Sequence, residues 1–233
     1  MFTPDTLPSV IPVFPLTGVI LMPGNRLPLN IFEPRYLAMV GDAAKGNRLI
    51  GMIQPKTVED RDSRPDLHGV GCLGYIEELE TTSDGRFLIA LKGLCRFQIL
   101  TELDATTQYR QVQVDYSDFR HDLASENTAP EEESTISADK KRRLLADIQE
   151  LLISNGVKPD QDVLKDSDDL LLINTLAMRS PFSPLEKQAL LEARTTAERG
   201  DILLSLIEML LKSDMVLAND NGPPSPNSGP TVN

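Results

Sequence analysis

The spacing of hydrophobic and polar positions changes near residue 120 of this 233-residue chain. Before that point the apolar runs are short and strand-like. After it, apolar residues recur every three or four positions, as they do on one face of a helix. The first half therefore predicts about six strands in a small antiparallel-rich sheet or barrel. The second half predicts a helical bundle, which makes the expected fold class α+β.

Turn signals divide the first half into strands. The expected strands are 11–15, 26–32, 49–54, 69–82, 86–94, 96–103 and 110–116. Prolines flank the first of these runs, which favours an edge strand because proline cannot donate to a ladder. Asp84-Gly85 lies between two strand-like runs and predicts a hairpin. Pro34 fits the first turn of a helix that ends at Gly46.

Four helices are expected in the second half. They cover about 144–152, 170–177, 184–193 and 196–212, each with an apolar stripe at helical spacing. Ser183, Pro184 and Glu186 form a capping-box pattern at the start of the third helix.

Composition predicts how these parts are joined. Residues 120–138 are acidic and hold few apolar side chains, so they are expected to form a linker. The expected organisation is a β-barrel subdomain in residues 1–119, the linker, a helical bundle in 139–213 and a disordered tail in 214–233.

The net charge of −12 narrows the choice of partners. An acidic chain repels phosphate backbones and anionic lipids, so neither nucleic acid nor a membrane is expected as a partner. The N-terminus shows no secretion signal, and no apolar run approaches the 18 residues typical of a membrane span. These features favour a cytoplasmic location.

Cys72 and Cys95 are too few for a secreted disulfide framework. With a two-residue turn at Asp84-Gly85, residue 72 faces 97 and residue 95 faces 74. The two cysteines are then diagonal neighbours about 7–8 Å apart, which is slightly too far for an unstrained disulfide. Two buried free thiols are therefore predicted.

Four segments together resemble the N-terminal, substrate-binding domain of Lon proteases, in its bacterial stand-alone form. They are 13–16 (VFPL), 30–36 (NIFEPRY), 92–97 (KGLCRF) and 184–192 (PLEKQALLE). The resemblance covers about residues 9–212. It implies a PUA-like β pseudo-barrel followed by helices, and it implies recognition of unfolded or tagged polypeptides.

No segment carries the phosphate-binding loop of an ATPase, and the resemblance does not extend to the Ser-Lys protease module. No catalytic residue, cofactor or metal site is expected, and His68 and His121 are expected to be solvated loop side chains. The function expected is an ATP-independent, non-catalytic module that binds unfolded or extended polypeptide. An adaptor- or chaperone-like role beside a separate protease would fit such a module.

Phe32, Glu33, Arg35 and Tyr36 are the candidate peptide-binding residues. Arginine and tyrosine are common interface anchors. The competing interpretation is a strand-to-helix corner, in which the carboxylate favours the helix start and the aromatic rings pack. The structural interpretation is favoured, because corners of this kind need such residues for packing in any case.

Two other functions remain open from the sequence. A small hydrolase would need a nucleophile and a base in one pocket, although no Gly-x-Ser-x-Gly motif supports it. An RNA-binding protein would fit a PUA-like fold, but the negative charge argues against it.

Overall fold

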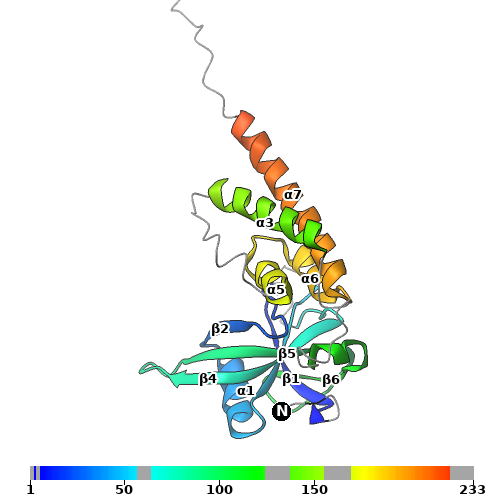
Figure 1. The fold of residues 1–233 in the computed structure, drawn as a ribbon. Helices are drawn as coiled ribbons and strands as arrows, with labels where there is room; N and C mark the ends of the chain where they lie inside the picture. The colour runs from blue at the N-terminus through cyan, green and yellow to red at the C-terminus, as the bar shows by residue number, and fades with distance from the viewer. Residues whose placement is uncertain (1–2, 4–5, 57–63, 124–136, 155–168, 221–233) are drawn as a thin grey trace, which may run out of the picture.

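The chain folds as a β-barrel with a helical layer above it (Figure 1). The computed structural model describes residues 3, 6–56, 64–123, 137–154 and 169–220. In Figure 1 the short helices α5 and α6 lie between the sheet and the longer helices α3 and α7, and the β4–β5 hairpin projects to one side. The α+β class predicted from the sequence is confirmed.

Six strands form a single sheet in the order β2-β5-β4-β3-β1-β6. Their bounds are β1 Val10–Pro15, β2 Arg26–Ile31, β3 Leu49–Ile53, β4 Val70–Thr81, β5 Phe87–Glu102 and β6 Arg110–Asp115. A further pairing of β5 with β6 closes five of the strands into a ring and leaves β2 outside it. Closure removes open strand edges from the barrel itself.

β1 is not the edge strand that its prolines suggested. It pairs with β3 in parallel and with β6 in antiparallel orientation, so it lies inside the sheet. Pro12 precedes Val13, the first residue paired with β3, and Pro15 ends the strand. The prolines therefore occupy positions where a missing donor does little harm to the ladder.

The predicted strands 86–94 and 96–103 are one strand, β5, 16 residues long. Its first part pairs with β2 and its last part with β6. The same strand therefore belongs both to the closed ring and to the β4–β5 hairpin. The register is bulged twice against β4. At Gly93 an added Cβ would lie 2.1 Å from the Met22 carbonyl oxygen, which explains glycine at the bend.

The hairpin turn also differs from the prediction. Thr81 faces Phe87 and the Thr82 amide donates to the Arg86 carbonyl, so the loop has three residues rather than two. Gly85 has a positive φ of 81°, as expected in a three-residue loop. Cys72 consequently faces Arg96, one position from the predicted partner.

The helices agree with the predicted pattern. Their bounds are α1 Pro34–Lys45, α3 Ala138–Ser154, α5 Asp169–Arg179, α6 Pro184–Glu192 and α7 Thr196–Asp220. The capping box at Ser183 and Glu186 is formed, and α1 begins at Pro34 and is capped by Gly46. Helix α7 continues through seven residues of the segment expected to be a disordered tail, while 221–233 lie outside the described residues.

The segment predicted as a linker begins inside an ordered 3-10 segment, η2 (Ser117–Leu123). Asp122 is buried there against Arg96 of β5. His121, expected to be solvated, lies 3.0 Å from an Arg96 nitrogen and is only partly exposed. The remainder of the predicted linker, apart from its last two residues, lies outside the described residues.

Buried polar groups fix the helical layer to the barrel. The Gln54 side chain donates to the Pro184 carbonyl and to Gln188, and Gln188 donates to the Val70 carbonyl of β4. Arg96 donates to the Leu191 carbonyl at the end of α6. One continuous hydrophobic core spans both parts, so the helical layer is docked on the barrel rather than tethered beside it.

Candidate functional site

The strands β2, β5 and β4 extend beyond the barrel as a three-stranded sheet. In β2, exposed residues at 26, 28 and 30 alternate with half-buried or buried leucine and isoleucine at 27, 29 and 31. One face of the extension therefore packs on the body of the protein, and the other faces solvent. Two cross-strand rows cross this outer face, Pro28–Ala90–Glu78 and Asn30–Leu88–Glu80.

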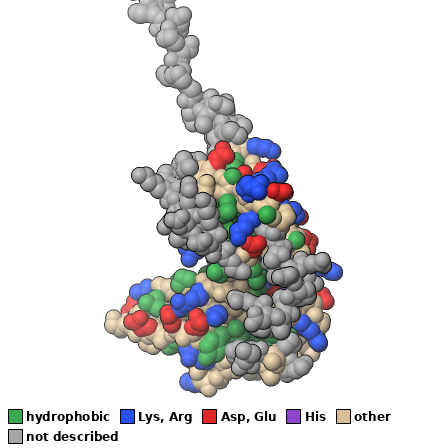
Figure 2. Space-filling view, in the orientation of Figure 1, with side chains coloured by type: hydrophobic (Ala, Val, Ile, Leu, Met, Phe, Trp, Pro, Cys, Tyr) green, Lys and Arg blue, Asp and Glu red, His purple; other side chains and the backbone are tan. Residues whose placement is uncertain are grey.

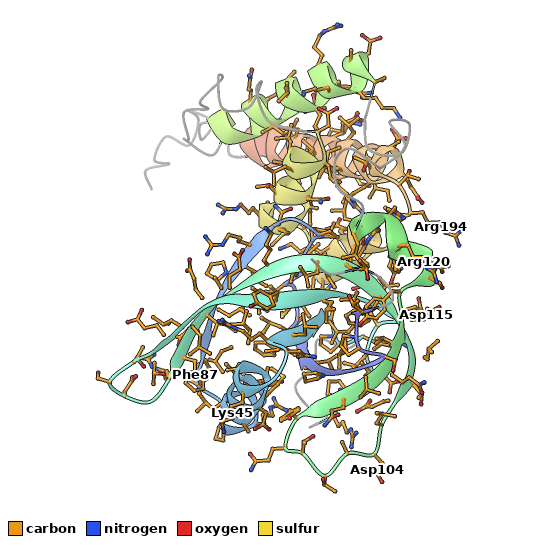
Figure 3. All side chains as sticks on the ribbon, turned by 60° about the horizontal axis from the view of Figure 1, so that its bottom comes forward. Lys45, Phe87, Asp104, Asp115, Arg120 and Arg194 are labelled. Atoms are coloured by element: carbon orange, nitrogen blue, oxygen red, sulfur yellow. The ribbon has the colours of Figure 1, made fainter. Side chains whose placement is uncertain are left out.

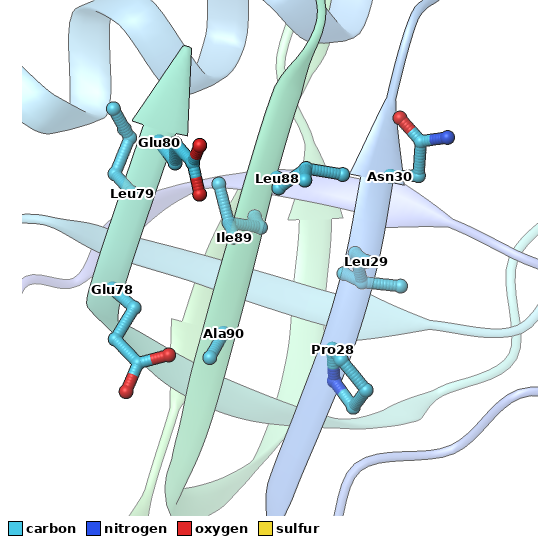
Figure 4. A pocket seen from close by; sticks show the side chains of 9 residues that line it. All are labelled: Pro28, Leu29, Asn30, Glu78, Leu79, Glu80, Leu88, Ile89 and Ala90. Carbon is cyan, nitrogen blue, oxygen red and sulfur yellow. The ribbon is translucent and has the colours of Figure 1, made fainter. Parts of the chain in front are cut away.

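A groove of about 780 Å³ lies on this extension (Figure 4). Nine residues line it: Pro28, Leu29, Asn30, Glu78, Leu79, Glu80, Leu88, Ile89 and Ala90. β5 supplies the floor, with β4 and β2 as walls. Leu88 keeps 42% of its surface exposed, although it lies in the middle strand of the three. An exposed leucine at the centre of a groove this size is typical of a binding surface.

The groove is acidic on one side. Its lining includes Glu78 and Glu80 and no Lys or Arg. Arg26 forms exposed ion pairs with Glu78 at 2.6 Å and with Glu77 at 2.9 Å. Within the described residues, no ion-pair partner of Glu80 is found. Figure 2 shows hydrophobic side chains interspersed with acidic and basic ones along the projecting hairpin.

Addition of a further strand at β2 is disfavoured. The Gly93 amide donates to the Asn25 carbonyl, so alternate residues 27, 29 and 31 of β2 bond to β5 and residues 26, 28 and 30 point their backbone groups outward. Pro28 is the middle one of these and has no N–H. The open edge of β2 thus lacks a donor at its centre, which is a common protection against strand pairing.

The predicted peptide-binding residues lie elsewhere, at the start of α1. Arg35 and Tyr36 line a second pocket, of about 230 Å³, together with Arg64, Tyr109 and Arg110 among others. Glu33 and Phe32 are not in its lining, although Phe32 is 63% exposed. Two of the four residues proposed from the sequence, Arg35 and Tyr36, therefore lie beside a pocket.

The geometry of this corner is mainly that of a folded turn. Tyr36 is buried with its ring centroid 4.2 Å from that of Phe14, and this burial raises the pKa of its hydroxyl. The Arg35 guanidinium lies 4.6 Å above the Tyr36 ring and pairs with Glu33 at 2.9 Å. Burial and ring stacking explain Tyr36, and the ion pair with Arg35 explains Glu33, whereas Arg35 keeps an exposed surface.

The two cysteines do not form a reactive thiol site. Cys72 and Cys95 are free and buried, as predicted, and burial raises the pKa of both thiols, which keeps them protonated. A buried thiol of this kind is a poor nucleophile. Among the described residues no group of three His, Cys, Asp or Glu side chains could hold a metal ion, and none of the helices has the length and apolar character of a membrane span.

The fold and the groove define a small α+β module with a broad groove on the surface of its described part. The sequence model described as the ATP-dependent protease La (LON) substrate-binding domain matches residues 10–209. The chain therefore belongs to the family of Lon substrate-binding domains, as the sequence motifs indicated.

Relatives at the sequence level are full Lon proteases. Lon protease 2 of Myxococcus xanthus is 24% identical over 87% of this chain, and Lon protease of Flavobacterium johnsoniae is 25% identical over 93%. The chain spans only 24% and 26% of those two proteins. The match covers the substrate-binding region and not the ATPase or protease regions.

Solved structures show the same fold. The N-terminal domain of the Mycobacterium avium complex Lon protease superposes with a TM-score of 0.61 at 20% identity, covering 85% of this chain and 98% of that one. The Lon N-terminal domain protein from Xanthomonas campestris gives 0.58 at 22% identity, with coverages of 84% and 97%.

Proposed function

We propose that this chain is a non-catalytic module that binds unfolded or extended polypeptide in the groove formed by β2, β5 and β4. The observation that carries the proposal is the 780 Å³ groove with the exposed Leu88 at its floor. Membership of the Lon substrate-binding family supports polypeptide as the ligand. An adaptor-like role, in which the bound polypeptide passes to a separate protease, is part of the same proposal.

The second candidate surface is the pocket beside Arg35 and Tyr36. Its volume of about 230 Å³ is less than a third of that of the groove, so it could hold one side chain rather than a segment. Both of these residues already have partners in the fold, since Arg35 pairs with Glu33 and the Tyr36 ring packs on Phe14. The groove is therefore the stronger site for an extended chain.

Two leucines on the same strand provide a matched test. Leu88 lies in the groove, and Leu100, 59% exposed, lies near the other end of β5 outside it. Leu88→Asp should weaken binding of a permanently unfolded, fluorescently labelled protein by about ten-fold or more, as expected for a central apolar anchor. Leu100→Asp should leave the affinity unchanged. Equal effects of the two substitutions would contradict the groove as the binding site.

A further inference from the structure

The groove has a polarity across its width that selects a kind of polypeptide. Six of its nine lining residues lie in the two outer rows: Glu78 and Glu80 on β4, the exposed Leu88 and the buried Ala90 on β5, and Pro28 and Asn30 on β2. These six residues form the two cross-strand rows, so each glutamate lies level with one residue of the floor and one of the opposite wall.

The spacing of the glutamates matches an extended chain. Glu78 and Glu80 are two residues apart on one strand, so their side chains leave the same face about 6.6–6.8 Å apart. Alternate side chains of any extended peptide repeat at the same distance. A peptide lying along β5 can therefore place two successive alternate side chains against the two carboxylates.

The carboxylates of Glu78 and Glu80 on β4 can accept a positively charged group from a ligand. Glu78 pairs with Arg26 in an ion pair whose side chains are 71% and 53% exposed, and such exposed pairs exchange readily. No ion-pair partner of Glu80 is found among the described residues. An incoming ammonium or guanidinium group would complete the charge balance, whereas an incoming carboxylate would add repulsion.

We infer that the groove selects extended segments in which basic residues alternate with apolar ones. The basic residues face Glu78 and Glu80, and the apolar residues face Leu88 and Pro28. This inference rests on the proposed function, because it specifies which polypeptides the same groove prefers. It concerns the charge pattern of the ligand, and the groove can bind polypeptide even where that preference is absent.

Three labelled peptides of equal length test it, each with leucine at alternate positions and lysine, glutamine or glutamate between. The lysine peptide should bind the intact chain most tightly and the glutamate peptide least. The advantage of lysine over glutamine should be about five-fold at low salt, since the new ion pair at Glu80 contributes up to about five-fold and a pair at Glu78 replaces the existing one with Arg26. High salt should remove most of the difference.

Two double variants test whether Glu78 and Glu80 cause the preference for the lysine peptide. Glu78→Gln with Glu80→Gln should abolish the lysine advantage while the glutamine peptide still binds. Asp104→Asn with Asp118→Asn changes the net charge equally at exposed positions outside the groove and should preserve the advantage. Figure 3 labels Asp104, on the loop that joins β5 to β6.

The possible results distinguish the charge preference from the proposed binding of polypeptide in the groove. If lysine and glutamine peptides bind equally and both depend on Leu88, the charge inference is wrong and the groove stands. If the control variant loses the lysine advantage as fully as the groove variant, the preference comes from overall charge and the inference is also wrong. If no peptide binds in a way that depends on Leu88, the proposed function itself fails.

Discussion

Arg96 of β5 and Asp122 of η2 form a buried, two-point ion pair. The Nε and Nη2 groups of Arg96 each donate to a carboxylate oxygen of Asp122 at 2.9 Å, and both side chains are at most 6% exposed. The same guanidinium lies 4.4 Å from the Phe119 ring centre and donates to the Leu191 carbonyl of α6. One side chain thus joins the barrel, η2 and the helical layer.

Removal of one partner of this pair should destabilise the protein strongly. Asp122→Asn leaves the guanidinium buried without a counter-charge, which costs about 3–5 kcal/mol in the free energy of unfolding. Urea unfolding followed by circular dichroism measures it. Asp139→Asn, which breaks the exposed pair with Arg142 in the first turn of α3, should cost at most about 1 kcal/mol. Similar small effects for both variants would show that the buried pair does not hold the layers together.

Two glycines should respond in opposite directions to alanine. At Gly93 a Cβ would meet the Met22 backbone, and backbone cannot turn aside, so Gly93→Ala should lower stability by about 1–3 kcal/mol. Gly41 lies inside α1 with nothing within 4 Å of an added Cβ, so Gly41→Ala should raise stability by about 0.4–1 kcal/mol. Thermal unfolding of the two variants checks both signs.

The buried thiols predict a loss of stability at alkaline pH. Burial raises the pKa of Cys72 and Cys95 above the unfolded value of about 8.5. As the pH rises past that value the unfolded chain loses these protons first, so the free energy of unfolding falls. Replacement of both cysteines by alanine should flatten this dependence between about pH 8.5 and 10. An unchanged slope in the double variant would assign it to other groups.

Arg35→Ala distinguishes the groove from the corner at α1. Arg35 is nearly half exposed; among the described residues its one ion pair is with its neighbour Glu33, and its contact with the Tyr36 ring is at the surface, so only a small change in melting temperature is expected. We also expect no loss of affinity for unfolded polypeptide. Weakened binding at an unchanged melting temperature would place peptide recognition at Arg35 and Tyr36 instead.

Much of the fold could be predicted because local chemistry determines it. The Ser183 capping box, Pro34 at the start of α1 and the helical stripes act over a few residues, and all three are confirmed. The hairpin register was wrong by one position because Gly85 alone does not distinguish two-residue from three-residue loops. The place of β1 was wrong because pairing with β3 and β6 is a long-range property.

The groove could not be found from the sequence for a related reason. Glu78, Leu88 and Pro28 come from three different strands. Only the pairing registers of β2, β5 and β4 place them in two neighbouring cross-strand rows. One signal was available: residues 87–91 are all apolar, although they lie in a projecting hairpin where alternation is expected. An apolar residue on the outer face of such a strand is a reason to search for a partner.

Hydrogen exchange of the intact chain, with and without a permanently unfolded protein, shows whether polypeptide binds in the groove formed by β2, β5 and β4. We expect slower exchange of backbone amides in residues 29–30, 78–80 and 88–90 when polypeptide is bound, and no protection there in Leu88→Asp. The amides of 99–102, which include Leu100 on the same strand, serve as the internal reference. Protection confined to other segments, or no protection at all, would contradict binding in the groove.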